Sequence, residues 1–255
     1  MIFYFSATGN SKYVAARISS IIGERIISIT DCVKNQQFEF EVNENERVGI
    51  IAPTYFWGMP TIVNEFLDKM KLTPQTLREP YTYHVATYGT TTGQTGRIVK
   101  HFLKSKGLNL QARFCVQMPD TWTPLFDLSD KQEVEKTNRN AEKEIELLCK
   151  QIEERTIGDF SKKKMPLIFA KISYIFYEQY RKTKKFKVED SCIGCELCMN
   201  KCPVEAISIE ENKPVWIKEK CTLCLSCLHH CPTFSIQYGK NTKKHGQYVN
   251  PNIKV

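Results

Sequence analysis

No stretch of this 255-residue chain contains the 18 or so uninterrupted apolar residues that a membrane-spanning helix needs, so we expect no transmembrane segment. The N-terminal residues Met1–Phe5 lack a basic leader and a small-residue cleavage site, which predicts a strand instead of a secretory signal, and hence a cytoplasmic protein. Two phosphate-binding signatures are also missing. Neither Gly-x-Gly-x-x-Gly nor Gly-Lys-Ser/Thr occurs, so we expect neither a dinucleotide-binding fold nor a nucleoside-triphosphate loop.

Acidic residues are scarce in one segment. The chain contains 36 Lys and Arg and 28 Asp and Glu, and residues 161–187 contain nine of these basic residues but only one of the acidic ones. The net charge of +8 therefore comes from this segment, and the rest of the chain has equal numbers of basic and acidic residues. We interpret the segment as a solvated linker face in preference to a docking surface. Nucleic-acid binding is not expected, because no recognised binding motif accompanies the charge.

Cysteines are numerous and unevenly placed. Eight of the eleven lie between residues 192 and 231, in a chain that is larger than a disulfide-stapled secreted domain, so a metal site is the better interpretation. Cys32, Cys115 and Cys149 stand alone and are expected to be small core side chains.

The first 160 residues alternate short apolar runs with helical patterns, which is the order of βαβ units in a parallel sheet. The runs predict five strands and four helices between them. The strands are expected at Met1–Phe5, Ile26–Ser28, Arg47–Ala52, Thr82–Thr87 and Phe114–Gln117, and the helices near Ser11–Ile22, Pro60–Met70, Gly93–Lys106 and Asp130–Glu154.

Four regions follow from this pattern: an α/β domain over residues 1–160, a basic linker helix over 161–185, a cysteine-rich domain over 186–240 and a basic tail over 241–255. The apolar stretch Met165–Tyr180 is interrupted by polar residues, which predicts an amphipathic helix that packs between the two domains, with binding to a membrane surface as the alternative. The tail is expected to be flexible or to form a strap across one domain.

The cysteine spacing is specific. The run Cys192-x2-Cys195-x2-Cys198-x3-Cys202-Pro203 is repeated as Cys221-x2-Cys224-x2-Cys227-x3-Cys231-Pro232. This is a two-cluster iron–sulfur spacing in which the fourth cysteine of each run binds the other cluster. We therefore expect two [4Fe–4S] clusters, the first bound by Cys192, Cys195, Cys198 and Cys231, and the second by Cys221, Cys224, Cys227 and Cys202. Zinc is the alternative, but two zinc sites do not require this triple spacing with Cys-Pro in both halves.

The two halves differ at one loop position, where Gly194 of the first run is matched by Leu223 of the second, so glycine is not demanded there by both loops. His229 and His230 are expected to be surface or neighbouring side chains, because the thiolates already complete both sites. Residues 186–240 resemble the two-cluster bacterial ferredoxins at all eight ligand positions. The resemblance implies a small α+β domain that transfers single electrons at low potential.

The N-terminal strand runs into Ser6-Ala7-Thr8-Gly9-Asn10-Ser11, and a helical pattern follows. Hydroxyls and backbone N–H groups at a helix N-terminus favour a phosphate, and Gly9 allows close backbone approach; a simple helix cap is the alternative. Two further loops follow strands whose carboxyl ends share the same sheet edge. They are Pro53-Thr54-Tyr55-Phe56-Trp57-Gly58-Met59-Pro60 and Thr87-Tyr88-Gly89-Thr90-Thr91-Thr92-Gly93, and together they predict a site for a planar ring.

Residues 1–160 resemble the flavodoxins, whose phosphate loop has the pattern of Ser6–Ser11. The resemblance implies a doubly wound parallel sheet that binds FMN, with Tyr55, Trp57 or Tyr88 stacking on the flavin and the Gly58 and Gly89 regions bonding its edge. The order of parts in the whole chain resembles flavodoxin–ferredoxin fusion proteins.

These parts predict an electron carrier that relays low-potential electrons between redox protein partners, because FMN accepts one or two electrons and each cluster passes one. An alternative is an enzyme in which FMN reduces a small acceptor such as a quinone or a nitro compound. A third reading has the first domain as a docking module without flavin. The sequence specifies neither the donor and acceptor nor an oligomeric state.

Overall fold

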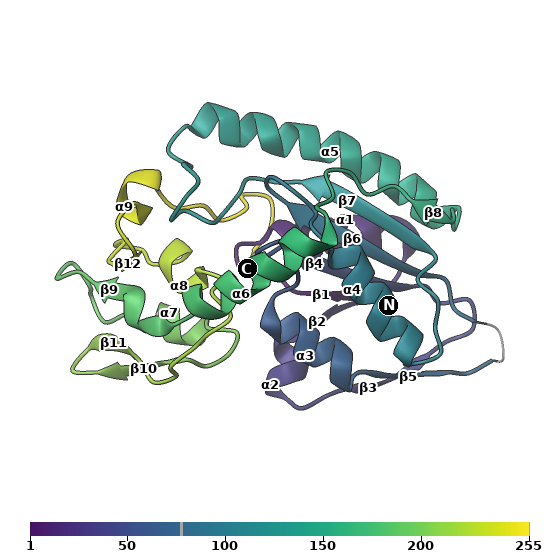
Figure 1. The fold of residues 1–255 in the computed structure, drawn as a ribbon, viewed down its shortest axis with the longest axis horizontal. Helices are drawn as coiled ribbons and strands as arrows, with labels where there is room; N and C mark the ends of the chain where they lie inside the picture. The colour runs from purple at the N-terminus through teal and green to yellow at the C-terminus, as the bar shows by residue number, and fades with distance from the viewer. Residues whose placement is uncertain (77–78, 255) are drawn as a thin grey trace.

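The computed structural model describes residues 1–76 and 79–254. A six-stranded parallel sheet in the order β2-β1-β4-β6-β7-β8 forms its centre (Figure 1). The strands are β1 (Ile2–Tyr4), β2 (Ile26–Ser28), β4 (Val48–Pro53), β6 (Thr82–Tyr88), β7 (Ala112–Gln117) and β8 (Gly158–Asp159). All five expected strands are present, and β8 adds a short edge strand that was not expected. The doubly wound α/β fold class is confirmed.

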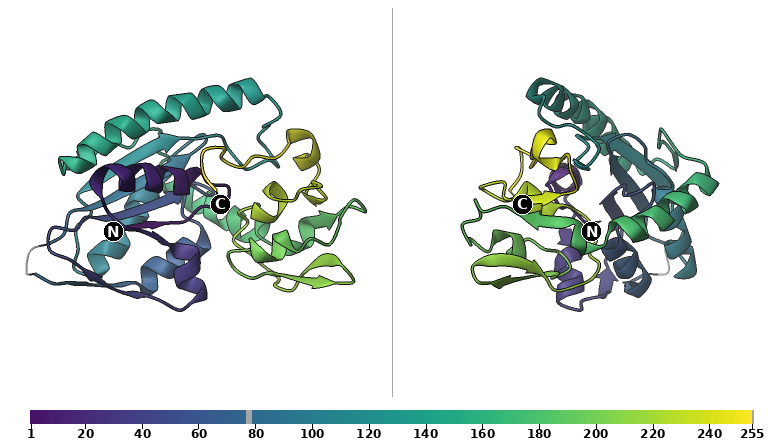
Figure 2. Two further views of the ribbon diagram at one scale, coloured as in Figure 1. Left: turned by 180° about the vertical axis from the view of Figure 1, so that it is seen from behind. Right: turned by 60° about the vertical axis from the view of Figure 1, so that its left-hand side comes forward.

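Helices cover both faces of this sheet, because successive side chains of each buried strand point to opposite faces. Ile50 packs with one set of helices and Ile51 with the other. The first face is covered by α2 (Ile29–Lys34), α3 (Thr61–Lys69) and α4 (Thr95–Ser105), and the second by α1 (Asn10–Ile22) and α5 (Lys131–Glu153). Figure 2 shows α1 and α5 on the same side of the sheet.

A small parallel pair lies beside the main sheet and was not expected. It consists of β3 (Glu39–Val42) and β5 (Lys71–Pro74). In β3, Phe40 and Val42 are buried and Glu39 and Glu41 are exposed, so the alternation typical of a half-buried strand was present in the sequence.

The cysteine-rich part, residues 186–240, contains two antiparallel strand pairs and two short helices, so the small α+β architecture is also present. Its elements are β9 (Phe186–Val188), α7 (Leu197–Asn200), β10 (Ile207–Glu210), β11 (Lys213–Trp216), α8 (Ser226–His229) and β12 (Ile236–Tyr238). The backbone repeats between the halves. Left-handed φ values occur at three matched pairs, Gly194 (68°) with Leu223 (53°), Glu196 (60°) with Leu225 (55°), and Glu205 (49°) with Phe234 (51°). Both loops therefore take the same left-handed turn, and Leu223 adopts it although a side chain there is strained.

Helix α6 (Leu167–Tyr180) and a short 3-10 turn, η1 (Thr183–Lys185), connect the two parts (Figure 1). Tyr177 on α6 is fully buried; its hydroxyl donates to the carbonyl of Thr222 (2.7 Å), and the backbone N–H of Thr61 donates to that hydroxyl (3.4 Å). One tyrosine thus joins the linker helix, the start of α3 and the second cysteine run.

The chain ends against the N-terminal part. After α9 (Thr242–His245), residues 246–254, which we call the strap, return to the first loop (Figure 2). The backbone N–H of Asn250 donates to the carbonyl of Thr8 (2.7 Å), and its side-chain amide donates to Oδ1 of Asn10 (3.0 Å). The last residue of the expected tail, Val255, lies outside the described residues. Within residues 1–76 and 79–254, no helix has both the length and the apolar content that crossing a bilayer requires.

Candidate cofactor sites

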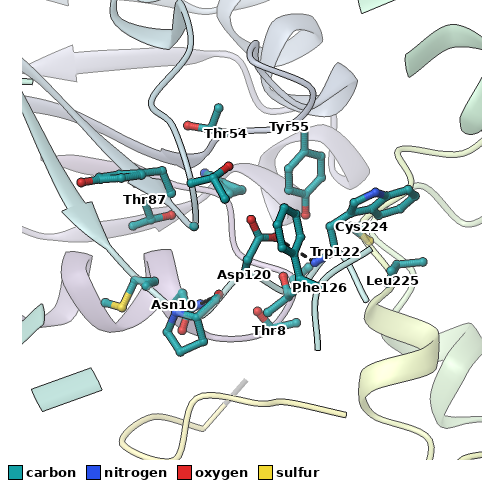
Figure 3. A pocket seen from close by; sticks show the side chains of 18 of the residues that line it. Thr8, Asn10, Thr54, Tyr55, Thr87, Asp120, Trp122, Phe126, Cys224 and Leu225 are labelled. Atoms are coloured by element: carbon teal, nitrogen blue, oxygen red, sulfur yellow. Dashed lines mark hydrogen bonds between the residues drawn. The ribbon is translucent and has the colours of Figure 1, made fainter. Parts of the chain in front are cut away.

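A cavity of about 370 Å³ lies at the carboxyl edge of the main sheet, where the N-terminal and cysteine-rich parts meet. Loops that follow β1, β4, β6 and β7 line it, together with Ser173 of α6 and residues 223–225 of the second cysteine run. In Figure 3, Cys224 and Leu225 approach the cavity across from Asn10 and Thr87.

The first loop turns the chain from β1 into α1. Gly9 has φ +98°, a left-handed conformation, and its N–H donates to Oγ of Ser6 (3.1 Å). A helix of 13 residues begins directly after it, and the first turn contains no acid. Unpaired N–H groups and the positive end of the helix dipole at this position favour a bound anion. The hydroxyl of Ser11 also bonds Oγ1 of Thr87 (2.8 Å), which joins the first loop to the third.

The second loop contains a strained turn. Tyr55 and Gly58 exchange both backbone hydrogen bonds (3.0 and 2.8 Å), while Phe56 and Trp57 between them have φ values of +47° and +61°. Such a turn normally contains asparagine and glycine. Residues in sparsely populated backbone regions cost about 1–3 kcal/mol each, so the surroundings must hold this turn in place.

Residues on two sides of the second loop hold its turn in place. The ring of Phe56 packs on Tyr177 (5.2 Å between centroids) and Trp122 (5.4 Å), so it belongs to the contact between the two parts of the chain. The carbonyl of Trp57 accepts the N–H of Gln94 (2.8 Å). Gly93 has φ +54°, and a methyl group on it would lie 2.2 Å from the Trp57 carbonyl oxygen, so the close approach of the two loops requires glycine.

A fourth loop, after β7, was not assigned from the sequence. Asp120, Trp122 and Phe126 all line the cavity. The Asp120 carboxyl packs against Gly89 and accepts the N–H of Trp122 (3.1 Å). Burial raises the pKa of Asp120 to about 6. The available signal was topological, because this loop leaves the same sheet edge as the other three.

Of the fourteen residues expected at the flavin, twelve line this one cavity, and they come from three separate loops. These are Ser6, Thr8, Asn10, Ser11, Pro53, Thr54, Tyr55, Phe56, Trp57, Thr87, Tyr88 and Gly89. Gly9 and Gly58 are not among the lining residues, although each shapes its loop. Tyr88 is almost fully buried, and the ammonium of Lys163 lies 5.7 Å from the centre of its ring.

One buried polar atom indicates that the cavity suits a polar ligand. Oγ1 of Thr54 is shielded from solvent and has no hydrogen-bond partner among the described residues. A buried hydroxyl left unpaired costs about 1–3 kcal/mol, and a ligand with polar groups would satisfy it. The residues present therefore fit a flavin with a phosphate at the first loop.

The eight cysteines of the two runs fall into two groups. Cys192, Cys195, Cys198 and Cys231 line one small cavity together with Pro232. The other four are Cys221, Cys224 and Cys227 of the second run and Cys202 of the first. Burial raises the pKa of the Cys221 thiol to about 11, and the nearby Cys202 thiol contributes to this rise. Backbone N–H groups donate to the sulfurs of Cys202, Cys221 and Cys231 (3.2, 3.3 and 3.3 Å).

His229 is buried, so of the two positions expected for it, at the surface or beside the cysteines, the surface position is wrong. Its Nδ1 accepts the N–H of Tyr248 in the strap (3.2 Å), so Nε2 carries the proton and donates to the carbonyl of Thr121 (2.9 Å). Burial lowers its pKa to about 4, so the imidazole is neutral. It joins α8, the strap and the fourth cavity loop, a role that no local sequence pattern indicated.

The family model of the flavodoxin domain matches residues 1–147, and that of the 4Fe-4S dicluster domain matches residues 184–246. A search of curated proteins finds no match. Among solved structures, the chain is similar to the Trp repressor binding protein from Bacillus subtilis, with 14% identity over 55% of this chain and 97% of that chain and a TM-score of 0.33. It is also similar to an azoreductase from Bacillus anthracis str. Sterne (8% identity, 60% and 100% covered, TM-score 0.35) and to a flavone reductase (10%, 92% and 86%, 0.34).

Proposed function

Since the chain belongs to the flavodoxin domain family and continues into a 4Fe-4S dicluster domain, we propose that it relays electrons within one polypeptide between an FMN and two [4Fe–4S] clusters. The two domains establish redox chemistry with a flavin and iron–sulfur centres. FMN, when bound, supplies a group that exchanges one or two electrons, whereas each cluster exchanges one.

Three features support FMN as the flavin. The first loop and the N-terminus of α1 offer one anion site, which suits a single terminal phosphate. Thr54 offers a buried hydroxyl to a polar ligand atom. The cavity, about 370 Å³, lies at the small end of the range of about 300–1,000 Å³ that encloses a single ligand. We assign Tyr55 and Trp57 to the flavin ring, because both line the cavity, whereas the ring of Phe56, which also lines it, is stacked on Tyr177.

The arrangement of the cysteines supports clusters rather than zinc. Cys231 lies in the same cavity wall as Cys192, Cys195 and Cys198, as the crossed ligand set requires. Zinc would draw its four ligands to one atom at about 2.3 Å from each sulfur. No three Cys, His, Asp or Glu side chains of the described residues converge closely enough to hold a single ion. Four-iron clusters use one iron per thiolate and therefore need the sulfurs further apart.

The observation that carries the proposal is the shared wall. Cys224, a proposed ligand of the second cluster, lines the cavity opposite Asn10 and Thr87 (Figure 3). Leu223 and Leu225 on either side of it are almost fully buried and exclude water from this wall. The first ligand set instead includes the exposed Cys195, next to Ile193, which is 66% exposed. We therefore assign the second cluster to the flavin side and the first to the side that meets protein partners.

The cavity size also bears on the alternative enzyme. A reductase of small acceptors needs substrate-sized space over the flavin ring in addition to the flavin itself, and a cavity at the small end of the usual range for one ligand favours the carrier. The segment between the two matched regions, residues 148–183, is too short to form a nicotinamide-binding domain.

Two measurements test the proposal. Protein purified without oxygen is expected to contain one FMN and, from two four-iron clusters, about eight iron atoms per chain. In anaerobic stopped-flow experiments, a reduced low-potential iron–sulfur protein is expected to bleach it quickly, and NADH or NADPH alone to do so slowly. Clusters without flavin, or fast reduction by NAD(P)H followed by steady turnover of a quinone, would contradict the carrier.

A further inference from the structure

Helix α6 carries an apolar stripe that faces solvent. Seven of the fifteen exposed large hydrophobic side chains of the described residues lie on this one 14-residue helix. The stripe has the spacing i, i+1, i+4, i+7 and i+8 and consists of Ile168 (65% exposed), Phe169 (49%), Ile172 (46%), Ile175 (66%) and Phe176 (55%). The opposite side of the helix, with Ala170, Ser173 and Tyr177, is buried against the rest of the chain. The helix thus has a second apolar face that the fold does not use.

Positive charge surrounds this stripe. Residues 161–187 contain nine Lys and Arg and one acid, Glu178, which already pairs with Arg181 (2.8 Å) and Lys220 (3.0 Å). The basic side chains lie at both ends of the helix and at one position within it: Lys162, Lys163, Lys164, Lys171, Arg181, Lys182, Lys184, Lys185 and Lys187. Figure 1 shows α6 crossing the front of the molecule between the two parts, so the stripe is not enclosed between them.

We propose that α6 and the basic residues at its two ends bind the surface of an anionic lipid bilayer. An apolar helix face that enters the acyl boundary, with lysines reaching the headgroups, has the two signals that stable peripheral binding requires. Each cation close to an anionic surface contributes about 1 kcal/mol, which is about fivefold in affinity.

Charge argues against a second copy of the chain as the occupant. A symmetric dimer over the stripe would place the two basic segments beside each other, and like charges across an interface oppose association. An acidic redox protein would match the charge, but transient redox interfaces are small and their rims polar, and they do not call for a stripe of five bulky apolar side chains. A lipid surface accepts both the charge and the apolar stripe.

Flotation with lipid vesicles tests the proposal on the full-length protein with its cofactors. Vesicles of 70% phosphatidylcholine and 30% phosphatidylglycerol are expected to carry the protein, and vesicles of pure phosphatidylcholine to carry at least tenfold less. Raising NaCl to about 0.5 M is expected to release most of it, because salt shortens the range of charge attraction to a few ångströms. These comparisons need no variant.

Two double variants separate the apolar and the charged contributions. Ile168→Gln with Ile175→Gln is expected to weaken binding at least tenfold, and Lys171→Gln with Lys184→Gln about 25-fold, from two cations at about fivefold each. The matched control, Leu147→Gln with Ile157→Gln, changes side chains that are 61% and 73% exposed but lie outside α6, on α5 and just before β8, and should leave binding unchanged.

Four results would overturn the proposal: no flotation of the wild type, equal flotation on neutral vesicles, equal losses in the control, or a dimer in light scattering that Ile168→Gln with Ile175→Gln dissociates. Binding to an acidic iron–sulfur protein that these same variants abolish, without any vesicle binding, would assign the surface to a protein partner instead. None of these outcomes depends on whether the flavin and the clusters exchange electrons.

Discussion

Asn250 in the strap is expected to support the first loop, the proposed phosphate site, although the two lie far apart in the sequence. Its side chain is 3% exposed, donates to Oδ1 of Asn10 (3.0 Å) and accepts the N–H of Asn252 (3.0 Å). Asn250→Ala removes both bonds, but Oδ1 of Asn10 keeps the hydroxyl of Tyr248 (2.9 Å), so no buried acceptor is left unpaired. The net loss is therefore about 1–2 kcal/mol of stability.

This loss of stability in Asn250→Ala should change two measurable quantities, the Tm and the affinity for FMN. At roughly 2–4 °C per kcal/mol for a chain of this size, the Tm should fall by about 2–8 °C. If the phosphate loop loses about 1 kcal/mol of this support, the Kd for FMN rises about fivefold. Riboflavin, which lacks the phosphate, should bind within about twofold of the wild type. Fluorescence titration of the cofactor-free flavin site with both ligands, alongside thermal scans, measures these effects.

The control for Asn250→Ala is the variant Asn252→Ala. Asn252 is exposed, and Asn252→Ala retains its backbone N–H, so the Tm and both affinities should stay close to the wild type. A fall in Tm with unchanged FMN binding would show that the strap stabilises the fold without shaping the loop. Equal weakening of FMN and riboflavin would place the effect elsewhere in the cavity. Either result refutes the reasoning.

Three further predictions concern the clusters and the cavity. Cys231→Ala should damage the cluster whose other ligands come from the first cysteine run, and electron paramagnetic resonance that finds only the other cluster damaged would reverse the crossed assignment. Burial raises the pKa of Asp120 to about 6, so its contribution to stability is complete below its pKa in the unfolded chain and is lost as the pH rises through about 6. The Tm of the flavin-free protein should therefore fall between about pH 4 and 6 more steeply than that of Asp120→Asn, and equal slopes would contradict this cause. Gly93→Ala combines a left-handed φ with a clash against Trp57, so it should weaken FMN binding more than Gly107→Ala, where φ is +78° but the surrounding space is open. Equal effects of the two variants in chemical denaturation and in FMN titration would exclude the clash as the cause.

Local patterns predicted much of this molecule. Buried runs such as Val48–Pro53 need both faces covered, so they identify central strands directly. The pattern Ser6–Ser11 predicted a loop before a helix, because its residue types suit a helix start. In the cysteine-rich part, spacing alone predicted that Cys231 would lie beside the first run, and both line one cavity.

Contacts between distant segments could not be predicted in this way. The sequence around Asp120 carries no motif, and its place in the cavity follows from the strand order and from its packing on Gly89. Cys224 was expected at a metal, and its second position in the wall of the flavin cavity depends on how α6 docks the two parts. Likewise, His229 is buried because segments far away in the sequence, at Thr121 and Tyr248, close over it.

The strap also fixes an order of events during synthesis. Asn10 and Asn250 are 240 residues apart, so at a synthesis rate of roughly 5–20 residues per second the first loop leaves the ribosome about 10–50 s before the strap that binds it. The cavity also lacks the wall at Cys224 until the second cysteine run has been made. A nascent chain therefore completes its flavin pocket only after all eight cysteines of the two runs have been translated, and a truncated chain without the cysteine-rich part lacks both the strap and that wall.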